Sequence, residues 1–73
     1  MIDAGFHDVL GQAKRLLHES PFPGIRMLDV EVDGEQFRLQ GNVNSYYLKQ
    51  IAQETVRSVV RNAELLNDVL VQA

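Results

Sequence analysis

The feature that most constrains this chain is a change of hydrophobic period along residues 28–71. Apolar and polar side chains alternate over residues 28–43, which is the pattern of strands with one buried face. The apolar spacing changes to three and four residues over residues 48–59, which is typical of a helix, and alternation returns over residues 65–71. The segment therefore predicts two strands, a helix and a third strand.

The first two strands are separated by a strong turn signal. The buried side of the first strand is predicted to hold Leu28, Val30 and Val32, and its outer side Asp29, Glu31 and Asp33. The dipeptide Asp33-Gly34 predicts a hairpin turn, after which the second strand alternates over residues 37–43. Gly41 in this strand is interpreted as a site where a helix side chain packs closely on the sheet; a close approach to a ligand is the alternative.

One helix precedes the hairpin and another follows it. Apolar residues recur with helical spacing over residues 6–17, and residues 21–24, which contain two prolines and a glycine, are expected to end this helix and form a loop. Asn44 or Ser45 is expected to cap the next helix. Asn62 is interpreted as a left-handed residue at the end of that helix.

The predicted fold is α+β, with the element order α-β-β-α-β. Strands two and three are joined through a helix, so they are expected to be parallel and to have a right-handed crossover. Both helices are then expected to pack on one face of a three-stranded mixed sheet. The chain has 73 residues, which predicts a single domain over residues 1–73 with a small core.

Composition excludes several classes of function. The chain has no cysteine, so disulfides and thiolate metal sites are excluded. Its net charge of -3 argues against nucleic acid as a partner, because binding phosphates requires a basic surface. No apolar run approaches the roughly 20 residues of a membrane span, and residues 1–5 lack the pattern of a signal peptide. We expect a cytoplasmic protein if Met1 is the native start, and a cell-envelope protein if the chain is an excised domain.

Residues 8–72 resemble the BON domain, a family named for bacterial osmotic-shock and nodulation proteins. Members show a Val-x-Val strand, a turn with glycine, a strand ending in Gly-x-Val, a capped helix and a last strand of the form Val-x-Asn-x-Leu-x-Val. The matching residues are Val30, Val32, Gly34, Leu39, Gly41, Val43, Ser45, Ala52, Val56, Asn67, Val69 and Val71. Two features depart from the family. Residues 61–63 replace its usual Pro-Gly or Gly-Val corner, and one copy is present where tandem copies are common.

The resemblance implies a non-enzymatic module, without a cofactor, that attaches to membranes or to partner proteins. Phospholipid contact is the usual proposal for the family. The residues themselves give no sign of catalysis, because no serine has a local pairing with a base and the acids of the first strand are interpreted as a solubility feature. The alternative is a protein-protein adaptor or self-associating domain, monomeric or weakly homo-oligomeric, that uses the open sheet face and an edge strand.

The lipid-contact candidates lie on the first helix. His7, Lys14 and His18 form a narrow strip beside the apolar face of the helix, and Arg15 lies next to this strip. Such a strip can contact anionic headgroups, and more strongly once its histidines are protonated. The alternative is a solvated helix flank. His7 and His18 are three turns apart, roughly 16 Å along the axis, so they cannot share a metal ion.

The candidates for contact with a protein partner are Met27, Tyr46, Leu66 and Leu70. Met27, Leu66 and Leu70 are out of phase with the core side of their strands, so we expect them on the open face of the sheet. Scattered exposed apolar residues are the alternative. Tyr46 opens the second helix and projects away from its apolar stripe, where an exposed tyrosine suits an interface.

Overall fold

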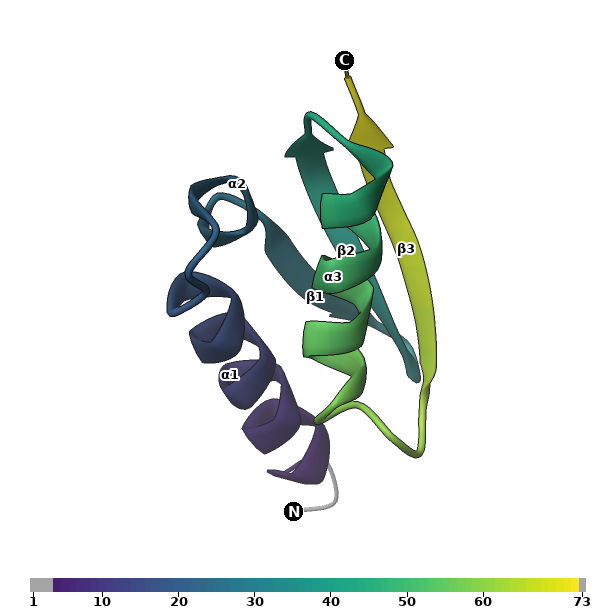
Figure 1. Cartoon of the computed structure of the whole chain (residues 1–73). Coiled ribbons are helices and arrows are strands. Elements are labelled where there is room, and N and C mark those ends of the chain that lie inside the picture. Colours follow the sequence, from purple (N-terminus) through teal and green to yellow (C-terminus); the bar gives the residue numbers. More distant parts are fainter. Residues whose placement is uncertain (1–3, 73) are drawn as a thin grey trace.

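The computed structural model describes residues 4–72 of the chain and contains helices on one side of a sheet (Figure 1). The helices are α1 (Ala4–His18), α2 (Pro23–Arg26) and α3 (Tyr46–Arg57). The strands are β1 (Asp29–Asp33), β2 (Gln36–Val43) and β3 (Glu64–Val71). The predicted α+β class and the order of the main elements are confirmed, and α2 is an addition.

The sheet has the order β1-β2-β3, with β2 in the centre. β1 and β2 are antiparallel, and Val30 lies opposite Leu39; β2 and β3 are parallel, and Leu39 lies opposite Asn67. The predicted directions and the phase of all three strands are therefore correct. Val69 is fully buried and Leu70 is exposed, which fixes the register of the last strand.

Both long helices cover the same face of the sheet. α1 packs on β1 and on α3, and α3 packs on β2 and β3. The largest fully buried side chains are Phe37, Leu17, Ile25, Leu39, Val30, Val56, Val60 and Val69. These side chains come from α1, α2, all three strands, α3 and the segment after α3, so one core joins the whole domain.

The hairpin between β1 and β2 has a two-residue loop, Gly34-Glu35. Gly34 has a positive φ of 66°, which glycine adopts without the steric penalty of a Cβ atom. Glycine at the first loop position is the pattern of a type II′ turn, whose twist matches that of the flanking strands. The predicted turn is therefore confirmed. Its two loop residues are Gly34 and Glu35, one position later than the dipeptide Asp33-Gly34 that predicted it.

Gly41 makes room for a side chain of the neighbouring chain segment rather than of a helix. A Cβ atom at position 41 would lie 2.5 Å from Leu28 Cδ2, and the backbone there has a φ of 133°. Leu28 directly precedes β1 and is buried. The interpretation that a helix side chain packs on Gly41 is therefore wrong: the glycine accommodates Leu28 and a backbone conformation that other residues rarely adopt.

The segment predicted to be a loop contains the short helix α2. Pro23 stands in its first turn, where the missing N–H of proline costs nothing. The helix inserts Ile25, fully buried, into the core beside α1 and α3. Ser20 orients the segment, since its Oγ accepts a hydrogen bond from the Phe22 N–H and its carbonyl oxygen accepts one from Arg26 Nη1.

α3 begins and ends with side-chain caps. Ser45 is the N-cap, and its Oγ accepts the Leu48 N–H at 3.2 Å, as one of the two predicted alternatives. After Ser58 the chain leaves the helix, and Arg57 Nη1 donates to the carbonyl oxygens of Val60 and Ala63. No described non-glycine residue has a positive φ, so the interpretation of Asn62 as a left-handed stop is wrong. The arginine cap replaces it.

Candidate interaction surfaces

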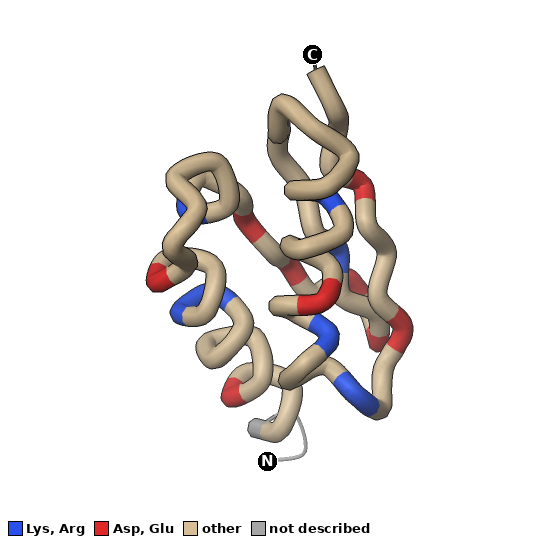
Figure 2. The backbone as a smooth tube through the Cα atoms, viewed as in Figure 1, with Lys and Arg blue, Asp and Glu red and all other residues tan. Residues whose placement is uncertain are grey.

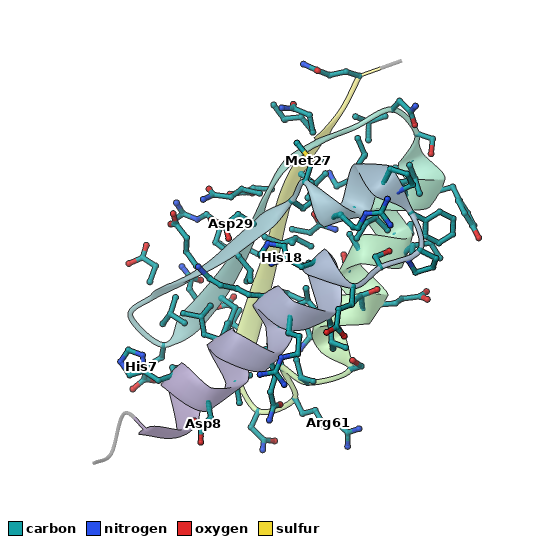
Figure 3. The ribbon with its side chains drawn as sticks, turned by 90° about the vertical axis from the view of Figure 1, so that its left-hand side faces the viewer. His7, Asp8, His18, Met27, Asp29 and Arg61 are labelled. Carbon is teal, nitrogen blue, oxygen red and sulfur yellow. The ribbon has the colours of Figure 1, made fainter. Side chains whose placement is uncertain are left out.

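The lipid-contact strip lies where α1 faces the edge strand β1. His7, Arg15 and His18 are exposed, and Figure 3 shows His7 and His18 near opposite ends of α1. Lys14 is only half-exposed, because its Nζ lies 3.6 Å from Asp29 Oδ1 on β1. The central cation of the strip is therefore already paired with a carboxylate of the same molecule.

The face of the sheet that the helices leave uncovered, called here the open face, is acidic. Its side chains are acidic and polar residues together with Leu66 and Leu70, and its carboxylates are those of Asp29, Glu31, Asp33, Glu64 and Asp68. Arg38 stands among them on the central strand, 3.3 Å from Asp33 and 3.6 Å from Asp68. Arg38 and, from α1, Lys14 pair with three of these five carboxylates, so the open face keeps a negative charge, which disfavours contact with anionic lipid.

The predicted partner-contact residues on the open face differ in exposure. Leu70, at the end of β3, is 60% exposed, whereas Leu66 is half-buried in the row that contains Glu31 and Arg38. Met27 precedes β1 and is 82% exposed. The open face therefore presents its apolar side chains at the end where β2 and β3 finish, and not across its middle.

The large exposed hydrophobic side chains gather at that same end of the molecule. They are Met27, Tyr46, Tyr47, Leu70 and Val71. Residues 20–25, 42–48 and 69–72, called here the charge-free end, contain no Asp, Glu, Lys, Arg or His. Figure 1 places α2, the start of α3 and the ends of β2 and β3 together, and Figure 2 shows no charged residue on the loop and the strand ends there.

A groove of about 490 Å³ crosses the charge-free end between α2 and the corner from β2 to α3. Phe22, Leu48 and Val43 form its apolar lining. Tyr47 stands at its side, with its ring edge-on to Phe22 at a centroid distance of 6.3 Å. Gln72 of the terminal segment also lines the groove, and it donates its N–H to the Val43 carbonyl oxygen.

More cations than unpaired acids lie at the border of the charge-free end. Arg26 is the last residue of α2, and Lys49 lies one turn into α3. The nearest strand carboxylates, Asp29 and Asp68, are each within 3.6 Å of a cation. Glu19, at the end of α1, is the exposed acid that remains near α2.

The outer edge of the sheet is partly closed by Asn67. Its Nδ2 donates to the Lys49 carbonyl oxygen and to Gln53 Oε1, which ties β3 to α3. Its Oδ1 accepts the Val69 N–H at 3.1 Å. The N–H groups of successive residues in a strand point to opposite sides. Gln72 donates its N–H to β2, so the N–H groups of the odd-numbered residues of β3 face the free edge. Asn67 therefore occupies an edge donor that another strand would need for pairing.

No group of three or more His, Cys, Asp or Glu side chains among residues 4–72 is placed to hold a metal ion. Within the same range, no helix has the length and hydropathy needed to cross a membrane.

The sequence itself contains a signal for the charge-free end, and of the predicted contact residues only Tyr46 and Leu70 belong to it. Its three uncharged stretches are far apart in the chain. Because β1 and β2 are antiparallel and β2 and β3 are parallel, the start of β1 and the ends of β2 and β3 lie at the same end of the sheet. The uncharged stretches and the strand directions together identify this end. The helical projection of α1 by itself indicated only the strip on that helix.

No protein-family model matches the chain, and no curated protein matches it significantly.

Proposed function

We propose that this chain is a non-enzymatic binding module that contacts phospholipid membrane surfaces. The observation that carries the proposal is the charge-free end, where the large exposed hydrophobic side chains gather. Apolar side chains gain free energy when they enter the boundary between headgroups and acyl chains, and tyrosine favours that boundary because its ring is apolar and its hydroxyl is polar. Tyr46 and Tyr47 stand there side by side, each more than 60% exposed.

The distribution of charge supports this orientation on the membrane. A bilayer with anionic lipids repels the carboxylates of the open face and of the β1–β2 hairpin. It accepts the charge-free end, and Arg26 and Lys49 at the border can reach the headgroups. The strip of His7, Lys14, Arg15 and His18 on α1 is a secondary contact in this proposal, because Lys14 is paired with Asp29.

A protein-protein adaptor is the second candidate, and the open face favours it. Its carboxylates suit a partner that brings cationic side chains. Two copies that met through these faces would instead place like charges together. The adaptor proposal therefore concerns another, basic protein more than a second copy of this chain.

Co-sedimentation with vesicles tests the membrane proposal. We expect the wild-type chain to bind vesicles of phosphatidylcholine containing phosphatidylglycerol. The double variant Tyr46→Asp with Tyr47→Asp should lose binding by about tenfold or more, since charge at the bilayer boundary is costly. Acids in the first turn of α3 favour the helix, so the variant should keep its fold.

A matched control separates position from net charge. Gln12→Asp with Asn62→Asp adds the same charge at exposed sites away from the charge-free end, and it should reduce binding much less. Equal losses in the two double variants would show that only net charge matters. If the wild-type chain binds no vesicle composition, the membrane proposal is rejected and the adaptor remains.

A further inference from the structure

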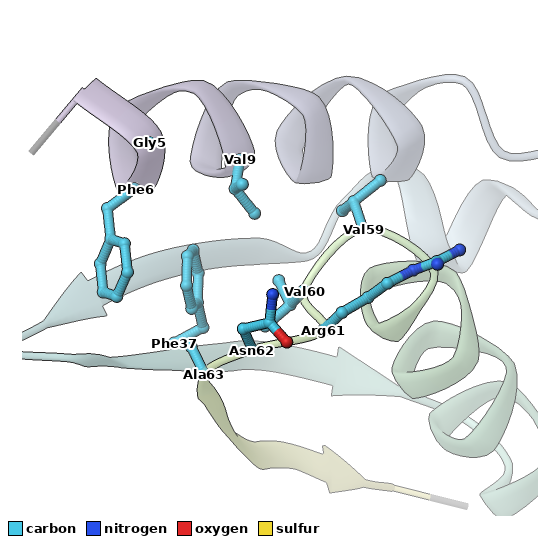
Figure 4. A pocket seen from close by; sticks show the side chains of 9 residues that line it. All are labelled: Gly5, Phe6, Val9, Phe37, Val59, Val60, Arg61, Asn62 and Ala63. Atoms are coloured by element: carbon cyan, nitrogen blue, oxygen red, sulfur yellow. The ribbon is translucent and has the colours of Figure 1, made fainter.

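A second apolar hollow lies at the opposite end of the domain from the charge-free end. It has a volume of about 310 Å³ and opens between the first turns of α1 and the connection from α3 to β3 (Figure 4). Its lining includes Phe6, Val9, Phe37, Val59, Val60 and Asn62. This volume is at the small end of the range for ligand sites, which suits one ring or a short chain.

The walls of the hollow are mostly apolar. Phe37 and Val60 form its base and are each 1% exposed, so they belong to the core. Phe6 on α1 faces Phe37 at a centroid distance of 5.4 Å, and Figure 4 shows the two rings side by side at one end of the hollow. An apolar body that enters here exchanges water for contact with side chains that are already fixed.

An acidic hollow adjoins the apolar one. The two share Asn62 and Ala63 as a common wall, and the acidic hollow is lined by Asp33, Glu35 and Glu64. Among the described residues, Asp33 is paired with Arg38, whereas no cation lies within ion-pair distance of Glu35 or Glu64. A molecule seated in the apolar hollow therefore has two unpaired carboxylates beyond the shared wall.

Two arginines also border the apolar hollow, and both keep their positive charge. Arg61 lines it, but its Nε donates to the Ser58 carbonyl oxygen, and Figure 4 shows its guanidinium directed away from Phe6 and Phe37. Arg57 donates to the carbonyl oxygens of Val60 and Ala63. The lining of the acidic hollow contains three carboxylates and neither arginine, so a positively charged head group is matched to that hollow better than a negative one.

We infer that the paired hollows bind a small amphipathic ammonium compound. Its apolar body lies between Phe6, Val9 and Phe37, and its ammonium group reaches over Asn62 toward Glu35 and Glu64. This site is separate from the charge-free end, so it stands or falls independently of the membrane proposal.

Three probes with one apolar body and different heads test the inference: 4-phenylbutylamine, 4-phenylbutanol and 4-phenylbutyrate. In titrations of the ¹⁵N-labelled chain followed by NMR, the amine should shift the amides that surround the two hollows. It should bind about fivefold more tightly than the alcohol, and the carboxylate more weakly than the alcohol, as expected for partly screened charges. Added salt should bring the three affinities together.

Two glycines of α1 provide a matched pair of variants. A Cβ atom at Gly5 or at Gly11 meets no heavy atom within 4 Å, so either position has room for a Cβ atom. Gly5 lines the apolar hollow and Gly11 does not. Gly5→Leu should therefore weaken the amine by about tenfold or more, whereas Gly11→Leu should leave its affinity unchanged.

The charge requirement has its own variant. Glu35→Gln with Glu64→Gln keeps the shape of the acidic hollow and should abolish the preference for the amine over the alcohol. The inference is overturned if no probe binds, if Gly5→Leu binds like the wild type, if Gly11→Leu weakens binding equally, or if the three heads bind alike. Amide shifts confined to another surface would overturn it as well.

Discussion

The ammonium group of Lys14 lies 3.6 Å from the carboxylate of Asp29, and the two groups join the middle of α1 to the start of β1. Both side chains are about half exposed. The pair therefore contributes little to stability, but it decides how much positive charge α1 can offer to a membrane.

The first prediction uses this pair to test the strip on α1. Asp29→Asn removes the partner of Lys14, so binding to anionic vesicles should increase if the strip contacts headgroups. Lys14→Glu with His18→Glu should decrease binding, because each change replaces a basic side chain of the strip with a carboxylate. Vesicle binding that ignores both variants would exclude the strip. A double-mutant cycle on Lys14 and Asp29 should give a coupling energy of about 0–1 kcal/mol.

The second prediction concerns Gly41. Gly41→Val should lower the free energy of unfolding by about 3 kcal/mol or more, through the contact with Leu28 and through the strained φ. Leu28→Ala alone should cost about 2–5 kcal/mol, because the leucine is buried. Together the two changes should cost less than the sum of the single losses, since the shorter side chain relieves the contact but not the backbone strain. Chemical denaturation measures both. A Gly41→Val variant as stable as the wild type would mean that the backbone can relax at this point.

The third prediction concerns Asn67. Asn67→Ala removes the hydrogen bonds to Lys49 and Gln53 and leaves the Val69 N–H without its acceptor, which should cost about 1–3 kcal/mol. Amide exchange at Val69 should accelerate more than the global loss of stability explains. Asn42→Ala, at an exposed position of β2, is the control and should change neither quantity.

The fourth prediction concerns self-association through the open face. Contact there would bring carboxylates of two copies together, so it should be weak, near or above about 0.1 mM, and should strengthen with added salt. Leu66→Asp with Leu70→Asp should remove it, because the changes delete apolar contacts and add carboxylates to a negative face, as judged from dilution-dependent amide shifts. Association that weakens with salt would point to contacts between opposite charges elsewhere on the surface.

Alternation and turn chemistry were enough to predict the sheet. The phase of Val30, Leu39 and Val69 follows from a period of two, and the parallel pairing of β2 and β3 follows from the helix between them. Asn44 and Ser45 were both predicted as caps because they precede a helical stripe, and the structure selects Ser45. These features depend on neighbours in sequence.

The features missed from the sequence depend on tertiary contacts. Proline and glycine around residues 21–24 indicated a loop, whereas burial of Ile25 holds this segment as α2. The partner of Gly41 is Leu28, which no local pattern reveals. The pairing of Lys14 with Asp29 likewise requires α1 to lie on β1. Each of these contacts joins residues that become neighbours only in the folded chain.

The separation of charge between the two ends has a consequence for motion in solution. The charge-free end is neutral, so the net charge of -3 is carried by the rest of the molecule and gives it a dipole about its centre. In the field of a negatively charged surface, a dipole rotates before any contact is made. Under the membrane proposal, the domain would therefore arrive with Tyr46 and Tyr47 leading and its hairpin trailing.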